Sequence, residues 1–420
     1  MSTTRREFIK TVGAAIATSQ ISPEPAAMGA AATAPLLTPA PAPNFAPHPA
    51  GAKRKVIYDQ DNSGPFGTDI LGTLMMLQAD NIDLLGITLV TGDAWMKQEM
   101  AFTLRLLELM GRTEIPVYAG AEFPMLNTKE EWLLRHQLYG GHRLDPWMGA
   151  FNRANGGPNE VKPLPPPYDR LASLKAQQEH AARFIIRAVR ENPGRVTIYA
   201  GGPLTNLALA IALAPDIVPL VPEVVIMGTG FHMFTNAFNI FFDPESARKV
   251  LRAAWPKCSI VTVDIAEEIH EGDEIAPGHR MIEEIASRAQ SPISDLFQMH
   301  AVEPLRRNPN MHFFRMADEM IAAQVIDPSV FTKSEQMYVD ICTTPGPRYG
   351  DSMFWPENWQ DVPAAGKSVS AADRRVFVDP RQFYLGPPPS TGLVNVLLEI
   401  DHDRFKKLFV DLMTKPIRKA

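Results

Sequence analysis

The chain has 420 residues, of which 45% are hydrophobic and 21% charged, and its formal net charge is -6. These values are typical of globular protein and supply enough apolar residues for one large domain or two smaller ones. The negative charge and the lack of a Lys/Arg stripe argue against a nucleic acid polymer as partner, and without a run of about 18 apolar residues no membrane span is predicted.

The N-terminal 52 residues carry signals for export rather than for folding. Residues 1–30 hold the twin arginines Arg5 and Arg6 before a short apolar run, which resembles a twin-arginine export signal; a disordered basic tail is the alternative. Residues 31–52 are mostly Ala and Pro, which cannot bury a core and are typical of a linker. We therefore expect a folded domain over 53–420, exported to the periplasm or the extracellular space.

The two cysteines, Cys258 and Cys342, neither require nor forbid a disulfide. Export would place the protein in an oxidising compartment, where such a bond is permitted. Their pairing is therefore left open by the sequence.

From Lys53 onward, strand-like apolar runs alternate with helix-like stretches. The strands are expected at residues 56–58, 84–90, 117–119, 196–200, 223–227 and 259–263. The helices are expected at residues 69–79, 96–110, 177–190, 205–213 and 244–253. This alternation predicts an α/β fold of the Rossmann-like kind, with an open, mostly parallel β-sheet flanked by helices.

The segment DQDNSGPFGTD, residues 59–69, places three carboxylates where the first strand runs into the first helix. Asp59 and Asp61 lie two residues apart, and Asp69 opens the helix. Close carboxylates raise one another's pKa unless a positive charge joins them, and a helix N-terminus supplies only about half a charge. A divalent cation with oxygen ligands, calcium or magnesium, is therefore indicated. The alternative is an N-cap beside a solvated turn.

Other strand ends should bring further groups to the same place. In open α/β sheets, ligands gather at the carboxyl ends of the strands. Asp93, Ala200 and Met227 all follow or end predicted strands, as Asp59 and Asp61 do. This convergence favours a functional site over a solvated turn.

Several motifs in order resemble the nucleoside hydrolases, and the resemblance extends from about Lys53 to Met413. The motifs are KVIYDQD, LLGITLVTGD, EIPVYAG, VTIYAGGPLTNLALAIAL, EVVIMGTGFH, AFNIFFDPESA, DEMIAAQVIDPSV and the closing VLLEIDHDRFKKLFVDLM. The resemblance implies a calcium-dependent enzyme that cleaves the N-glycosidic bond of a ribonucleoside, giving free base and ribose. It also implies a homo-oligomer.

The resemblance also implies roles for individual residues. Asp61 would bind Ca²⁺ and take the proton of the attacking water, and Asp69, Asp318 and the main-chain carbonyl of Ala200 would complete the metal site. A second set of residues would support the site or contact the substrate: Asp59, Thr68, Asp93, Met227, His232 and Asn239. At two of these positions, Thr68 and Asp93, relatives usually carry other residues. From its position after MGTGF, His232 is best interpreted as a structural histidine, with donation to a leaving base as the other interpretation, and the same two interpretations apply to His270.

Three departures from the family pattern bear on the substrate. Three extra residues and Thr68 stand where most members carry DPGxDDA, so a carboxylate that serves the ribose hydroxyls is missing. Ala317 replaces a histidine that helps the base to depart in one branch, and Ala237 replaces a glutamate that holds the 5'-hydroxyl. We therefore expect an aglycone or 5' group different from that of inosine or uridine.

Two other classes of protein remain open. One is a non-catalytic exported protein that binds a nucleoside or pentose. The other is a magnesium-dependent phosphatase, because a strand ending in DxD also resembles the haloacid dehalogenase loop, with Asp59 as the nucleophile. No convincing Lys and late Asp accompany that loop, which disfavours the phosphatase.

Overall fold

A computed structural model describes residues 51–139, 148–230, 237–268, 279–308, 316–358, 387–388 and 390–418. All of these residues belong to one compact unit, Pro39–Ala420. The proposed export signal, residues 31–50 of the proposed linker, His232 and His270 lie outside the described residues.

Within the described residues, nine strands form one sheet in the order β3-β2-β1-β4-β5-β6-β9-β7-β8. The strands are β1 (Arg54–Gln60), β2 (Ile82–Leu89), β3 (Val117–Ala119), β4 (Val196–Ala200), β5 (Glu223–Met227), β6 (Cys258–Val261), β7 (Phe331–Ile341), β8 (Ser352–Pro356) and β9 (Leu393–Ile400). All neighbouring pairs from β3 to β9 are parallel, whereas β7 pairs antiparallel with both β9 and β8. The prediction of an open, mostly parallel sheet is confirmed.

The α-helices of the described residues follow the strands in alternation. They are α2 (Thr68–Gln78), α3 (Met96–Met110), α4 (Lys129–Tyr139), α5 (Ala181–Glu191), α6 (Thr205–Leu213), α7 (Phe238–Phe242), α8 (Pro244–Leu251), α9 (Val263–Glu268), α10 (His279–Arg288), α11 (Ile293–Phe297), α12 (Glu303–Arg307), α13 (Ala317–Ile326) and α14 (His402–Thr414). None of them has both the length and the apolar character needed to cross a membrane.

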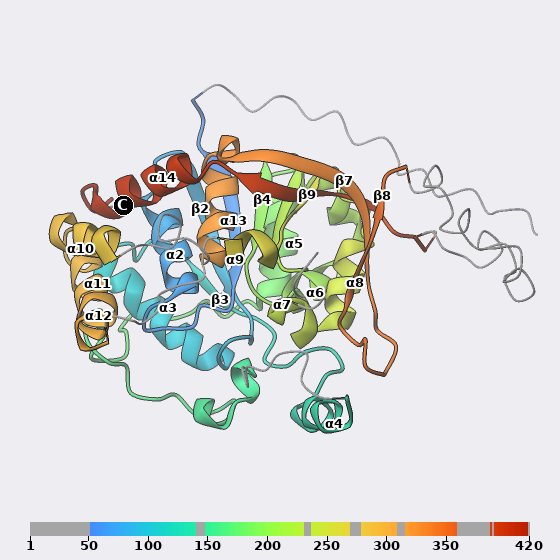
Figure 1. Cartoon of the computed structure of the whole chain (residues 1–420), viewed down its shortest axis with the longest axis horizontal. Helices are drawn as coiled ribbons and strands as arrows, with labels where there is room; N and C mark the ends of the chain where they lie inside the picture. Colours follow the sequence, from blue (N-terminus) through green and yellow to red (C-terminus); the bar gives the residue numbers. More distant parts are fainter. Residues whose placement is uncertain are drawn as a thin grey trace, which may run out of the picture. The chain divides into compact units, whose positions relative to one another are not determined.

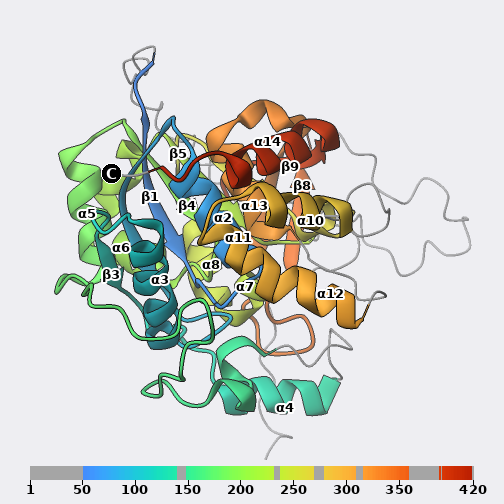
Figure 2. The same cartoon turned by 90° about the vertical axis from the view of Figure 1, so that its left-hand side faces the viewer.

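The helices cover the sheet on both faces. Helices α2, α13 and α14 contact one another on one side of the central strands, and α5, α6 and α8 form a contiguous layer on the other side (Figures 1 and 2). Strands β1, β4 and β5 lie between these layers, and their apolar side chains are almost fully buried. Burial on both faces explains why these strands are near-continuous apolar runs in the sequence.

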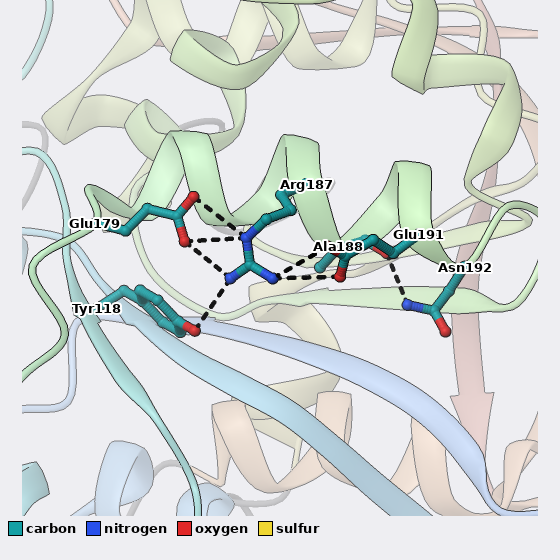
Figure 3. Close-up of polar contacts among 6 residues, drawn as sticks. All are labelled: Tyr118, Glu179, Arg187, Ala188, Glu191 and Asn192. Atoms are coloured by element: carbon teal, nitrogen blue, oxygen red, sulfur yellow. Dashed lines mark hydrogen bonds and ion pairs between the residues drawn. The ribbon is translucent and has the colours of Figure 1, made fainter.

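The outer face of α5 carries a polar network that links this helix to β3. Arg187 donates to Glu179 over 2.8 Å, to Glu191 over 3.2 Å and to the Tyr118 hydroxyl over 3.4 Å (Figure 3). Arg187, Glu179 and Glu191 are substantially exposed, so each ion pair contributes little to stability. The network is thus an exposed set of contacts between α5 and β3.

The predicted and observed boundaries agree closely at the strands that carry the site. Strands β3, β4 and β5 and helices α3 and α6 have the predicted bounds. The sixth strand ends at Val261 instead of residue 263, because α9 begins at Val263, and α5 begins at Ala181 instead of residue 177. Gln177 makes an isolated parallel bridge with Tyr118, which extends the sheet locally rather than the helix.

Both cysteines are free thiols. Cys258 is buried at the start of β6, and Cys342 directly follows β7. The disulfide that the sequence left open is absent from the structure.

Candidate active site

Asp59, near the carboxyl end of β1, forms the buried floor of the site. It is fully buried, and its Oδ1 accepts hydrogen bonds from Thr88 Oγ1 at 2.5 Å and from Asn206 Nδ2 at 2.8 Å. Burial raises the pKa of Asp59 to about 6, against the two hydrogen bonds, which lower it. Asn206 is the second residue of α6, in the GGPLTN motif, and this position brings its amide to Asp59.

Asp61 follows β1 directly and is 2% exposed. Its Oδ2 accepts the Asp93 main-chain N–H at 2.9 Å. A Cβ atom at Gly92 would lie 2.0 Å from Asp61 Oδ2, and one at Gly202 would lie 2.8 Å from Asp61 Oδ1. Glycine is therefore required on both sides, because the main chain packs directly against this carboxylate.

Asp69 and Asp318 bring two further carboxylates from the first turns of α2 and α13. Both are at least 95% buried, with exposed fractions of 5% and 4%, and their carboxyl groups contact each other. Asp69 Oδ2 accepts the Ser63 N–H at 2.8 Å, whereas Asp318 Oδ1 is buried without a hydrogen-bond partner among the described residues.

The electrostatics of this group are unfavourable without a positive charge. Burial, followed by the charges of Asp93 and Asp318, raises the pKa of Asp61 well above its ordinary value. Burial, followed by the charges of Asp61, Asp93 and Asp318, does the same for Asp69. In the part of the chain that the structure describes, no Lys, Arg or His forms an ion pair with Asp59, Asp61, Asp69 or Asp318.

The carboxylate oxygens of Asp61, Asp69 and Asp318 suit a hard cation, although these side chains are not arranged as a metal site in the structure. No group of three or more Asp, Glu, His and Cys side chains in the described ranges stands ready to hold a metal ion. Asp69 and Asp318 contact each other instead, as expected when one of two adjacent carboxyl groups is protonated. The buried oxygen of Asp318 that lacks a hydrogen-bond partner suits a cation, because carboxylate oxygens are the ligands that calcium and magnesium prefer.

Thr68 contacts protein groups at the junction of α2 and α13. Its hydroxyl accepts the Asp318 N–H at 2.8 Å and donates to Glu319 Oε2 at 2.7 Å. The predicted contact of Thr68 with the substrate stays a prediction, and the two hydrogen bonds described are to protein groups. In the structure Thr68 fixes the N-terminus of α13, and with it Asp318.

Ala200 and Met227 are the last residues of β4 and β5, and Asn239 lies beside them on α7. Ala200 is fully buried and pairs with Asp59 of β1. Asn239, on α7, donates through Nδ2 to the carbonyls of Gly201 and, at 3.5 Å, of Met227. The structure therefore brings these strand ends and α7 together.

Two fully buried carboxyl groups near the site, those of Glu99 and Glu319, were not predicted from the sequence. Burial raises the pKa of both well above the ordinary value. Each lies in the first turn of a helix, where an acidic residue usually faces solvent and complements the helix dipole. Nothing in the local sequence distinguishes them from that ordinary case.

Comparison with known proteins assigns this arrangement to a family. The family model described as "Inosine-uridine preferring nucleoside hydrolase" matches residues 56–407. The chain belongs to the inosine-uridine preferring nucleoside hydrolase family. It is thus a hydrolase acting on N-glycosyl compounds, and this membership replaces the phosphatase hypothesis.

Several proteins share extended similarity with this member of the nucleoside hydrolase family. A Schizosaccharomyces pombe protein is 34% identical over 222 residues, which are 51% of this chain and 63% of that protein. The pyrimidine-specific ribonucleoside hydrolase RihB of Escherichia coli is 28% identical over 304 residues, 71% of this chain and 86% of RihB. A solved plant nucleoside hydrolase, the PpNRh1 enzyme, superposes with a TM-score of 0.61 at 23% identity, covering 86% of this chain and 99% of the plant enzyme.

Proposed function

We propose that this chain hydrolyses the N-glycosidic bond of a ribonucleoside or a related pentoside, releasing the base and ribose. One observation carries the proposal beyond family membership. Asp59, Asp61, Asp69 and Asp318 converge from three separate elements, all at least 95% buried. A site so negative suits a reaction in which the sugar becomes positively charged.

Ca²⁺ is the proposed cofactor. The carboxylates of Asp61, Asp69 and Asp318 and the main-chain carbonyl of Ala200 would hold it. When bound, the ion supplies orientation of the sugar diol and lowers the pKa of a water molecule.

The other steps of the reaction are assigned to side chains and main-chain groups of the protein. Asp61 takes the proton of the attacking water, and the Asp93 N–H stabilises its charged form. The surrounding carboxylates stabilise the oxocarbenium-like sugar. Asn239, held by the carbonyls at the ends of β4 and β5, contacts the sugar, while His232 is proposed as a donor to the leaving base.

The substrate is proposed to differ from inosine and uridine in its aglycone or its 5' group. The hydroxyl of Thr68 is hydrogen-bonded to Asp318 and Glu319. Asp69 is the acidic residue in the first turn of α2, so this helix offers the sugar no carboxylate besides that of Asp69. Ala237, at the start of α7, is 1% exposed and offers no polar side chain to a 5'-hydroxyl.

The test is release of ribose from a panel of purine and pyrimidine nucleosides, measured as reducing sugar, with calcium and then with a chelator. Turnover that is lost on chelation and restored by Ca²⁺ supports the proposal. Calorimetric binding of ribose without any turnover would support a non-catalytic binding protein instead.

Export and self-association are proposed as well. Replacing Arg5 and Arg6 by Lys should retain the protein in the cytoplasm of a host with twin-arginine transport, whereas fractionation should find the unmodified protein outside it. Light scattering of the mature chain, from about Lys53, measures the proposed homo-oligomer.

A further inference from the structure

The turn that carries Asp93 is held at both of its peptide groups. On the N-terminal side, the Gly92 carbonyl accepts the Ala150 N–H at 2.8 Å, and the Asp93 N–H donates to Asp61 Oδ2 at 2.9 Å. On the C-terminal side, the Asp93 carbonyl accepts Asn155 Nδ2 at 3.0 Å. The direction of the Asp93 N–H is thus determined by its neighbours as well as by Asp61.

Glu99 completes this set of contacts. It lies in the first turn of α3, is fully buried, and accepts the Ala94 N–H through Oε1 at 3.0 Å. The peptide group between Asp93 and Ala94 is therefore held at its N–H by Glu99 and at its carbonyl by Asn155. A peptide group is planar, so two such contacts fix its orientation.

The second carboxylate oxygen of Glu99, Oε2, makes the burial of this side chain costly. Glu99 Oε2 is buried without a hydrogen-bond partner in the described part of the chain. An unsatisfied buried polar atom destabilises a fold, which offsets part of what the hydrogen bond to Ala94 contributes. The clearest effect of the Glu99 carboxylate is therefore on the orientation of the peptide that it binds.

The segment that supplies Asn155 is itself attached to the turn and to the start of α3. Trp95 Nε1 donates to the Gly156 carbonyl at 3.2 Å, and Gln98 Oε1 accepts the Lys162 N–H at 2.6 Å. The Asn155 amide also donates to the Gly149 carbonyl at 2.8 Å. The contact between Asn155 and Asp93 therefore rests on a fixed support.

We propose that Glu99 and Asn155 are positioning residues. They hold the peptide between Asp93 and Ala94, and this orients the adjoining Gly92–Asp93 peptide so that its N–H binds the Asp61 carboxylate in the geometry required for proton transfer. Neither residue touches the reacting atoms. The inference rests on the proposed role of Asp61 as the base, and it adds two residues that act through Asp93.

The experiment compares Glu99→Leu, Glu99→Gln and Asn155→Ala in the mature chain. Gln keeps an oxygen for the Ala94 N–H, whereas Leu fills the space without an acceptor. Since a shift of about 1 Å can cost about a hundredfold in rate, kcat should fall about tenfold to a hundredfold in Glu99→Leu, with KM within about twofold. Glu99→Gln should stay within about threefold of the wild type. Asn155→Ala releases the same peptide from its other side and should lower kcat in the same direction.

Glu108→Leu is the matched control on the same helix. The Glu108 carboxylate also accepts main-chain N–H groups, from Ser173 at 2.5 Å and Leu174 at 3.0 Å, but these belong to a loop away from Asp93. The control should lower the melting temperature and leave kcat unchanged. The control thereby distinguishes a loss of kcat caused by lower stability from one caused by a misplaced Asp93 N–H.

A crystal structure of Glu99→Leu gives a readout independent of activity. The distance from Asp93 N to Asp61 Oδ2 should rise from 2.9 Å to beyond about 3.5 Å, where the hydrogen bond is lost. An unchanged distance, or an unchanged kcat in both Glu99→Leu and Asn155→Ala, overturns the proposal. If the wild type releases no ribose from any nucleoside, the proposed function fails, and the distance alone decides the positioning role.

Discussion

Gly72 of α2 lies directly against Asp318 of α13: a Cβ atom at Gly72 would be 3.0 Å from the Cβ of Asp318. The two helices meet at their N-terminal halves, where each carries a carboxylate of the candidate site. The missing side chain of Gly72 therefore sets the distance between Asp69 and Asp318.

Gly72→Ala should lower both stability and calcium affinity. Overpacking costs about 1–3 kcal/mol, which exceeds the gain of about 1 kcal/mol from replacing Gly by Ala within a helix. We expect a net loss of about 1 kcal/mol in urea unfolding and weaker Ca²⁺ binding in calorimetry. Gly111→Ala is the control for the loss of a glycine, because Gly111 ends α3 at φ +67 with no atom within 4 Å of its Cβ position. It should affect stability without affecting calcium binding.

Without calcium, the stability of the fold should decrease as pH rises. The pKa of Asp59 and that of Asp318 are both raised by burial to about 6, above the unfolded value of about 4. A carboxyl group with a raised folded-state pKa contributes stability below the unfolded pKa and loses it as pH rises through the folded pKa. For Asp59 alone this is on the order of 3 kcal/mol.

Thermal unfolding in a chelator, recorded from pH 4 to pH 8, measures this loss. The melting temperature should fall most between about pH 4 and 6 and recover on addition of calcium at pH 8, because the ion replaces the protons. A melting temperature of the chelated protein that is flat or rises over this interval would contradict the prediction.

Asp61→Asn should abolish most of the ribose release. Removing a general base costs about 10²- to 10⁴-fold, and Asn has nearly the same shape as Asp. Asp83→Asn is the control, because Asp83 lies at the surface of β2, 47% exposed, in an ion pair with Lys55 at 3.4 Å. The two variants and the wild type are compared by their initial rates of ribose release from the nucleoside of the panel that the wild type cleaves fastest. Activity of Asp61→Asn equal to that of the control would refute the assignment of the base.

Asn206→Leu should destabilise the protein through Asp59. The amide of Asn206 donates to Asp59 Oδ1 and to the Leu89 carbonyl, and its oxygen accepts the Ala121 N–H at 2.8 Å. Leucine fills the volume but leaves these buried groups unpaired, at a cost of about 1–3 kcal/mol. Urea unfolding measures the cost. The double variant with Asp59→Asn should lose less than the sum of the single variants, because the two residues share one hydrogen bond.

The sequence alone determined the parallel strands at the centre of the sheet and singled out the carboxylates that converge at the candidate site. Apolar runs buried on both faces predicted the bounds of β3, β4 and β5, and the position of Asp61 after β1 predicted its place at a strand end. The antiparallel strand β7 was missed, because most of its first half is exposed and polar and gives no apolar alternation.

The tertiary structure decided which residues support those carboxylates. Thr68 and Glu319 are 251 positions apart in the chain, and Asn155 and Asp93 are 62 apart. A Thr at a helix start or a Glu in a first turn has the same local pattern whether it faces water or a buried neighbour. Only the packing of α13 on α2, and of residues 149–162 on the Asp93 turn, turns these ordinary residues into parts of the site, because long-range burial sets their partners.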